Sequence, residues 1–276
     1  MLTGFRVLWR AIVHFWDESL LMMRANVTWF VASLPLYLLT VLACGVFMPP
    51  VNADGEGSFL PWAAAAFLMV VIPQPISTGV YTIANFVVHE ETPEFPVFWQ
   101  AIRMLWKRTL VLYLIGAGVF AGLVFNTSFY MERVGGILQA VSILWFYVIL
   151  YWLTMQGYLL PMLVHAAIPP PPPASADDGW PVDESGRRPV KPPPPTPEPE
   201  IIPFGTLYKR AAILALANPL MSLVMLVGTL LALTISGFAL PVFPLIVMSF
   251  VALINCRGLR ALREKYFPTE AQGATG

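Results

Sequence analysis

The sequence predicts an all-α membrane protein with six transmembrane helices in three hairpin units, each preceded by an amphipathic helix at the cytoplasmic interface. Three observations lead to this fold class. Hydrophobic residues make up 57% of the chain and charged residues only 12%, whereas soluble proteins average about 25% charged residues. Six apolar stretches divide the chain, and almost all Lys and Arg residues fall on one side of them. A short aromatic pattern also recurs before each pair of stretches.

The six apolar stretches are long enough to cross a bilayer as helices. They comprise residues 27–47, 62–88, 110–129, 137–165, 213–236 and 238–255. A hydrocarbon core about 30 Å thick requires roughly 17–25 helical residues, and every stretch reaches that length. We therefore expect a multi-pass protein of the cell inner membrane, with the lipid bilayer as its first partner.

The positive charges predict the orientation of these spans. Arg133 is the only one of the 16 Lys and Arg residues that falls in a loop on the opposite side. Because short loops rich in Lys and Arg remain on the cytoplasmic side, we expect both termini and the two long loops to be cytoplasmic. This sidedness puts the basic groups beside anionic lipid headgroups, and nothing in it indicates a nucleic-acid partner.

A weak repeat with the pattern F-x-x-(L/F)-(W/Y) precedes each pair of spans, at residues 5–9, 95–99 and 204–208. In the first two copies, apolar side chains continue at i, i+3, i+4 and i+7, which is typical of helices lying in the headgroup layer. These helices either anchor the neighbouring spans or have a dedicated role with lipid or substrate. The candidate interfacial anchors are Phe5, Trp9, Phe95, Trp99, Trp106, Phe204 and Tyr208.

A proline-rich segment at residues 169–203 interrupts the apolar pattern. It has two proline runs around an acidic middle, and proline both fixes the backbone φ angle and removes a donor. We expect a disordered cytoplasmic loop that is either a spacer or a ligand of a cytoplasmic proline-binding protein. The predicted organisation is interfacial helices and spans 1–4 at residues 1–168, this loop, an interfacial segment with spans 5–6 at residues 204–267, and a disordered tail at residues 268–276.

The sequence contains no pattern typical of a catalytic site. It lacks the phosphate-binding motif G-x-x-x-x-G-K-(S/T) and the nucleophile motif G-x-S-x-G. His89 has no second histidine at metalloprotease spacing, and the predicted spans contain no Asp, Glu, Lys or Arg that would form a proton relay. We therefore expect no catalytic residues, no metal site and no cofactor, and the protein is predicted not to be an enzyme.

Uncharged polar residues and helix breakers are concentrated in the second stretch. Two prolines free backbone carbonyls of the preceding turn, and in a membrane those groups need water or neighbouring hydroxyls as partners. A broken helix of this kind is a feature of transport sites, but also of ordinary kinked spans. Together with two amides elsewhere in the chain, the residues of this candidate polar path or kink are Pro73, Gln74, Pro75, Ser77, Thr78, Asn85, Gln156 and Asn218.

Four segments together resemble the YesL-like family of small bacterial integral membrane proteins. They are RANVTW at residues 24–29, PQPISTGVY at 73–81, FPVFW at 95–99 and WKR at 106–108. The resemblance implies a compact multi-helix protein of a bacterial inner membrane, with relatives often encoded beside carbohydrate uptake and degradation systems. It transfers no catalytic residue. The sequence HEE at residues 89–91 and the 169–203 segment depart from the family pattern.

Two functions remain as hypotheses. The first is a transport-associated protein, acting either as a small permease-like path or as an accessory to a carbohydrate uptake system, with carbohydrate transporter subunits as partners. The alternative is a membrane scaffold or assembly factor that recruits cytoplasmic partners through its proline-rich loop and basic interfacial helices.

Overall fold

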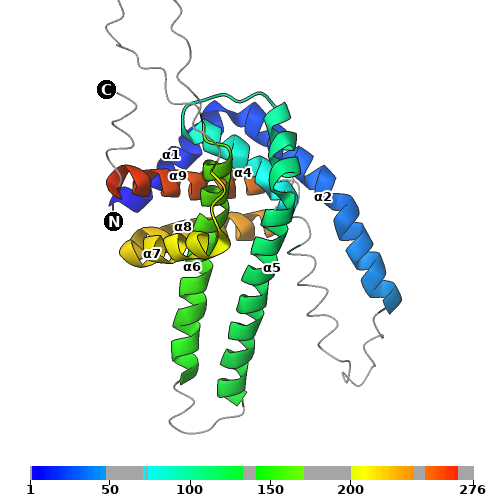
Figure 1. Cartoon of the computed structure of the whole chain (residues 1–276), viewed down its shortest axis with the longest axis vertical. Helices are drawn as coiled ribbons and strands as arrows, with labels where there is room; N and C mark the ends of the chain where they lie inside the picture. Colours follow the sequence, from blue (N-terminus) through cyan, green and yellow to red (C-terminus); the bar gives the residue numbers. More distant parts are fainter. Residues whose placement is uncertain are drawn as a thin grey trace, which may run out of the picture.

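The computed structural model describes residues 2–47, 71, 74–132, 141–170, 200–238 and 246–266. Within these ranges the chain forms eight helices and no strand, which confirms the all-α class (Figure 1). The predicted tail at residues 268–276 and most of the predicted loop at 169–203 lie outside the described residues, so this part of the domain organisation stays a prediction. The helices are α1 (Leu2–Asp17), α2 (Ser19–Phe47), α4 (Gln74–Val88), α5 (Pro96–Glu132), α6 (Val141–Ala167), α7 (Phe204–Ala217), α8 (Pro219–Phe238) and α9 (Met248–Tyr266).

Helix α4 is the centre of the helical body. It packs against α2, α5, α6 and α9, and its residues from Ser77 to Asn85 are all buried. A helix that is buried all round belongs to a core rather than to a lipid-facing surface. Helix α9 is similarly enclosed from Val251 to Leu259, because α1, α4 and α8 cover it. The polar side chains of these two helices therefore lie inside the protein, where they contact neighbouring helices.

Helices α5 and α6 lie side by side and extend beyond the other helices, with α7 and α9 lying across α6 (Figure 1). Segments Pro96–Met131 and Val141–Ala167 are long and apolar enough to cross a membrane. Segments Phe204–Ala217 and Pro219–Ile235 reach that length only together, and they are bent by 103° at their junction. The described residues thus supply two or three candidate spans, which is compatible with a membrane protein.

The second predicted interfacial helix is not separate from the span that follows it. Helix α5 is continuous over 37 residues, because residues 97–115 contain neither proline nor glycine to interrupt it. The third unit differs, since Asn218 ends α7 with φ −138° and ψ 62° and Pro219 begins α8. A residue before proline avoids the helical conformation, and this explains the sharp bend.

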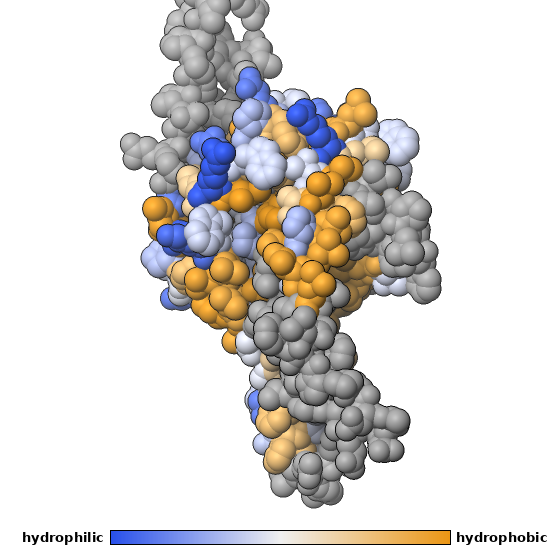
Figure 2. All heavy atoms as spheres, turned by 90° about the vertical axis from the view of Figure 1, so that its right-hand side faces the viewer, coloured by the Kyte–Doolittle hydropathy of each residue, from blue (hydrophilic) through white to orange (hydrophobic). Residues whose placement is uncertain are grey.

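Large apolar side chains are exposed on four of the longer helices. Examples from α2, α5, α6 and α8 are Leu38, Phe125, Leu144 and Leu231. Figure 2 shows such residues gathered into broad areas on the face seen from the right-hand side of Figure 1. Extensive exposed apolar surface marks contact with a membrane or with other proteins. Two of the helices that expose apolar side chains, α5 and α6, are also the two that are long and apolar enough to cross a membrane.

Candidate functional site

Two hydroxyl residues of α4 bond to neighbouring helices inside the body. The Ser77 hydroxyl accepts a hydrogen bond from the indole N–H of Trp29 in α2, with a nitrogen–oxygen distance of 2.9 Å. The hydroxyl oxygens of Thr78 and Thr109 lie 2.9 Å apart between α4 and α5, and all four side chains are buried. Because a buried polar group without a partner is costly, these bonds fix α4 against both neighbours.

Asn85 connects two histidines at the end of α4. Its backbone carbonyl lies 2.6 Å from Nδ1 of His89, and its side-chain oxygen lies 3.2 Å from Nδ1 of His165 in α6. A carbonyl oxygen only accepts hydrogen bonds, so each of these ring nitrogens carries a hydrogen and donates a hydrogen bond. The centroids of the two rings are 5.3 Å apart. The sequence did not predict this contact.

Arginines from α9 bind the C-terminal end of α4. The guanidinium groups of Arg257 and Arg260 donate hydrogen bonds to the Val88 carbonyl, one of the terminal carbonyls that lack an intrahelical partner. Positive charge is also favourable at this end of a helix dipole. Burial lowers the pKa of His89 to about 4, and the charge of Arg260 contributes to this shift. His89 is therefore uncharged at neutral pH, and its neutral ring and two arginines close this end of α4.

Gln74 and Pro75 of the second stretch lie at the beginning of α4. Gln74 is the first residue of the helix and Pro75 the second, and both are half-buried. Proline is tolerated in the first turn because its missing N–H would have no intrahelical partner there. Pro73 lies outside the described residues. A polar path around these residues stays a prediction.

The other two candidate path residues lie apart from this part of α4. Gln156 in α6 faces α5, since a Cβ added at Gly116 would meet its Oε1 atom at 2.9 Å. Asn218 lies at the bend between α7 and α8, where its side-chain oxygen accepts hydrogen bonds from Lys265 and Tyr266 at 3.1 and 3.0 Å. The structure therefore brings Ser77, Thr78 and Asn85 onto one helix and places the two amides elsewhere.

The sequence did not predict most of the hydrogen-bond partners of the buried polar side chains. Asn255 Nδ2 donates to the Tyr81 hydroxyl at 2.9 Å, and the Tyr158 and Ser222 hydroxyl oxygens lie 2.7 Å apart. Each of these residues is an uncharged polar group inside a predicted apolar stretch, which was the available signal. Their pairing was not readable, because the partners are 64 to 174 residues apart in the chain.

The predicted interfacial anchors of the first two repeat copies lie mainly at the surface. On α1, Phe5 and Trp9 are exposed, while the opposite face of the helix is buried. Trp99 and Trp106 of α5 are also exposed. Aromatic side chains at the surface suit the membrane–water interface, so an anchoring role for these residues stays a prediction with favourable geometry.

The third copy is packed against other helices. The Tyr208 hydroxyl donates a hydrogen bond to the Leu112 carbonyl of α5 at 3.0 Å, and its ring stacks on that of Trp152 in α6. The Phe204 ring lies 5.3 Å from the Arg108 guanidinium carbon. These two aromatic residues therefore join α7 to the α5–α6 pair.

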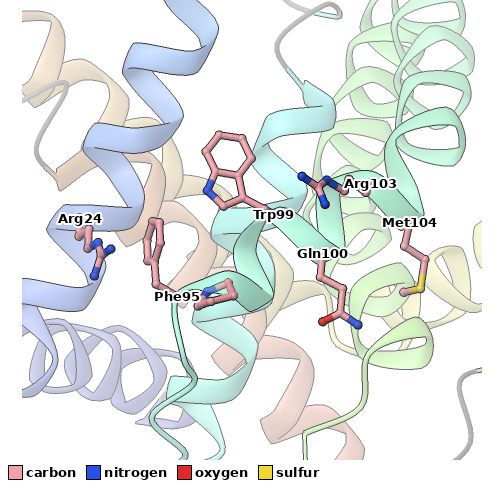
Figure 3. Close-up of a pocket in the computed structure, with 7 residues that line it drawn as sticks. Arg24, Phe95, Trp99, Gln100, Arg103 and Met104 are labelled. Atoms are coloured by element: carbon pink, nitrogen blue, oxygen red, sulfur yellow. The ribbon is translucent and has the colours of Figure 1, made fainter.

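A pocket of about 750 Å³ lies between α2 and the start of α5. The Arg24 side chain comes from α2 toward Phe95, while other lining residues project from successive turns of α5 (Figure 3). Cationic, aromatic, amide and thioether groups thus line one open cavity, and concave sites with a few polar groups are typical places for a ligand to bind. The lining residues are Arg24, Phe95, Pro96, Trp99, Gln100, Arg103 and Met104.

Within the described ranges, no group of three or more His, Cys, Asp or Glu residues is arranged to hold a metal ion. Comparisons of the chain with protein-family models, with curated proteins and with solved structures found no match. The resemblance to the YesL-like family therefore stays a prediction.

Proposed function

We propose that this chain is a multi-pass protein of a bacterial inner membrane, with cytoplasmic termini, that acts without catalysis as an accessory component of a transport system. The six-span topology and the motifs shared with the YesL-like family motivate the membrane and transport parts of this proposal. The partners would be subunits of a carbohydrate transporter. The exposed apolar faces of α5 and α6 offer surfaces for lipid or for the helices of such a subunit.

The packing of α4 favours an accessory role over a solute path of its own. Ser77, Thr78 and Asn85 are buried, and each bonds to a residue of another helix. A path needs polar groups that face water or substrate, whereas these hydroxyl and amide groups connect helices. The burial and hydrogen bonding of these three side chains is the single observation that favours an accessory role over a solute path.

Single-cysteine labelling tests whether the polar residues of α4 line a solute path. In a chain with Cys44 and Cys256 replaced by alanine, we would introduce cysteine at Ser77, Thr78 or Asn85 and expose membranes to a water-soluble maleimide from either side. If the protein is an accessory component, we expect the cysteine at each of the three positions to be unreactive from both sides. Graded reactivity along α4 would instead indicate a path. Gln100→Cys is the matched control, because this exposed residue should react from the cytoplasmic side only.

Transport measurements test the accessory role directly. Deleting the protein from its host should slow the uptake of a sugar, while the purified chain in liposomes should carry none. Sugar flux through liposomes that contain this chain alone would contradict the proposal. The scaffold alternative depends on residues 169–203, most of which lie outside the described residues, and it stays a prediction.

A further inference from the structure

We propose that the pocket between α2 and the start of α5 binds the phosphodiester headgroup of an anionic phospholipid, with Arg24 and Arg103 as the groups that contact the phosphate. This binding site goes beyond the proposed accessory function. It requires only that α5 enter the membrane, and it holds whichever transport or scaffold role the protein has.

The charge of the pocket favours an anion. Arg24 and Arg103 are both exposed, and both line the cavity. Within the described part of the chain, neither guanidinium group forms an ion pair with a carboxylate. Arg24 is instead held over the Phe95 ring, 4.0 Å from its centroid, so its charge is oriented without being neutralised. Two such guanidinium groups beside one cavity provide forked donors that match phosphate oxygens.

The position of the pocket along α5 favours a lipid as the source of that anion. The apolar part of α5 begins at Leu110, two residues after Arg108. Met104 lies six residues earlier, a distance of about 9 Å along the helix axis. The headgroup layer on each side of a bilayer is of comparable thickness, roughly 5–8 Å. The end of the pocket formed by Arg103 and Met104 therefore lies close to the level of lipid phosphates when α5 crosses the membrane.

The remaining lining residues suit the other parts of a phospholipid. Trp99 and Arg103 are one turn apart on α5, as are Gln100 and Met104, so each pair shares a side of the helix (Figure 3). Met104 is one residue closer to the apolar part of α5 than Arg103, so its side chain provides apolar contact near the first acyl carbons. Trp99 is one turn farther from the apolar part, at the interface where tryptophan is enriched. The Gln100 amide, one turn farther from the apolar part of α5 than Met104, is able to bond to the free hydroxyls of a headgroup glycerol. Basic pockets on the cytoplasmic side of membrane helices are typical sites for anionic headgroups.

The test is a lipid titration of the full chain in detergent, followed by native mass spectrometry. We expect dioleoylphosphatidylglycerol to bind with a first, saturable stoichiometry of one, and dioleoylphosphatidylcholine to bind far more weakly. Arg24→Gln and Arg103→Gln should each weaken phosphatidylglycerol binding about fivefold, because one basic residue contributes about 1 kcal/mol at an anionic surface. The double variant should lose more binding than either single variant, but not necessarily the product of the two losses, because both arginines contact the same phosphate.

Two further variants separate pocket geometry from general charge. Lys107→Gln removes an exposed cation one turn from Arg103 that does not line the cavity, so it should retain wild-type affinity. Arg103→Lys keeps the charge but loses the forked donors, and it should bind with intermediate affinity. Circular dichroism of each variant without lipid checks that the helices are intact, and both arginines are exposed, so we expect unchanged folding.

Three results would overturn the proposal. The first is undiminished phosphatidylglycerol binding by the double variant, and the second is an equal loss in Lys107→Gln. The third is binding of sn-glycerol 3-phosphate as tightly as the lipid, which would identify a site for a water-soluble phosphate. Failure of the accessory function would appear separately, as unchanged sugar uptake after deletion of the protein.

Discussion

The hydroxyl oxygens of Thr78 and Thr109 lie 2.9 Å apart where α4 packs against α5. Both side chains are fully buried, and the contact joins the central helix to one of the two helices long enough to cross a membrane. A polar pair in this position fixes how the two helices meet, because each hydroxyl depends on the other for a hydrogen bond.

Thr109→Val should destabilise the protein because it leaves the Thr78 hydroxyl buried without this partner. The expected loss in the free energy of unfolding is about 1–3 kcal/mol. The double variant Thr78→Val/Thr109→Val should be less destabilised than the sum of the single variants, since it removes both polar groups. Unfolding in detergent by a denaturant titration measures all three variants. Strict additivity would show that the two hydroxyls do not depend on each other.

Gly79→Ala should disrupt the contact between α4 and α5. A Cβ atom at this position would lie 2.7 Å from the ring of Phe98, which is completely buried and cannot move away easily. We expect destabilisation of about 1–3 kcal/mol from overpacking, measured as a lower midpoint of thermal unfolding. Gly118→Ala is the control, because its Cβ would meet no atom within 4 Å. That variant should be neutral or slightly stabilised by the higher helix propensity of alanine, and equal losses at both positions would contradict the packing argument.

Stability should decrease as the pH falls from about 6.5 to about 4. Burial lowers the pKa of His89 from 6.5 to about 4 in the folded protein, so the unfolded chain takes up a proton first as the pH decreases. The free energy of unfolding should fall across this window by up to about 3 kcal/mol, with no further loss from this group below it.

Thermal unfolding of the wild type and of His89→Gln at several pH values checks this dependence. The variant should have a shallower pH dependence, although not a flat one, because burial also lowers the pKa of His14. An identical dependence in both proteins would show that His89 does not titrate in this way.

Replacing residues 171–199 by a short Gly-Ser linker should leave the helical body intact. The ends of this segment are already close, since the Glu200 amide donates a hydrogen bond to the Ala166 carbonyl at 2.8 Å. A short linker therefore spans the gap without strain. Membrane insertion and the thermal midpoint should be unchanged. If the protein is a scaffold that binds partners through this segment, the same variant should lose its function while remaining folded, whereas an accessory protein should retain it.

The sequence by itself determined the elements whose cause is local. Apolar stretches predicted spans at residues 110–129 and 137–165, where α5 and α6 lie, and amphipathic periodicity predicted the helical start of α5 from the second repeat copy at 95–99. Pro219 bends the chain after Asn218 for an equally local reason, because proline restricts the preceding residue whatever surrounds it. The exposed aromatic face of α1 was also readable, since the positions of Phe5 and Trp9 follow from helical spacing alone.

Only the tertiary structure decided which polar groups meet. Thr78 and Thr109 are 31 residues apart, and Asn85 and His165 are 80 apart, so their pairing depends on how α4 packs against α5 and α6. The pocket likewise needs Arg24 from α2 beside Arg103 from α5. Local periodicity sets which face of a helix is apolar, but the relative placement of helices comes from the packing of all their buried side chains together. For that reason the sequence predicted the helices and the polar residues, while the contacts that define the candidate site became visible only in the folded chain.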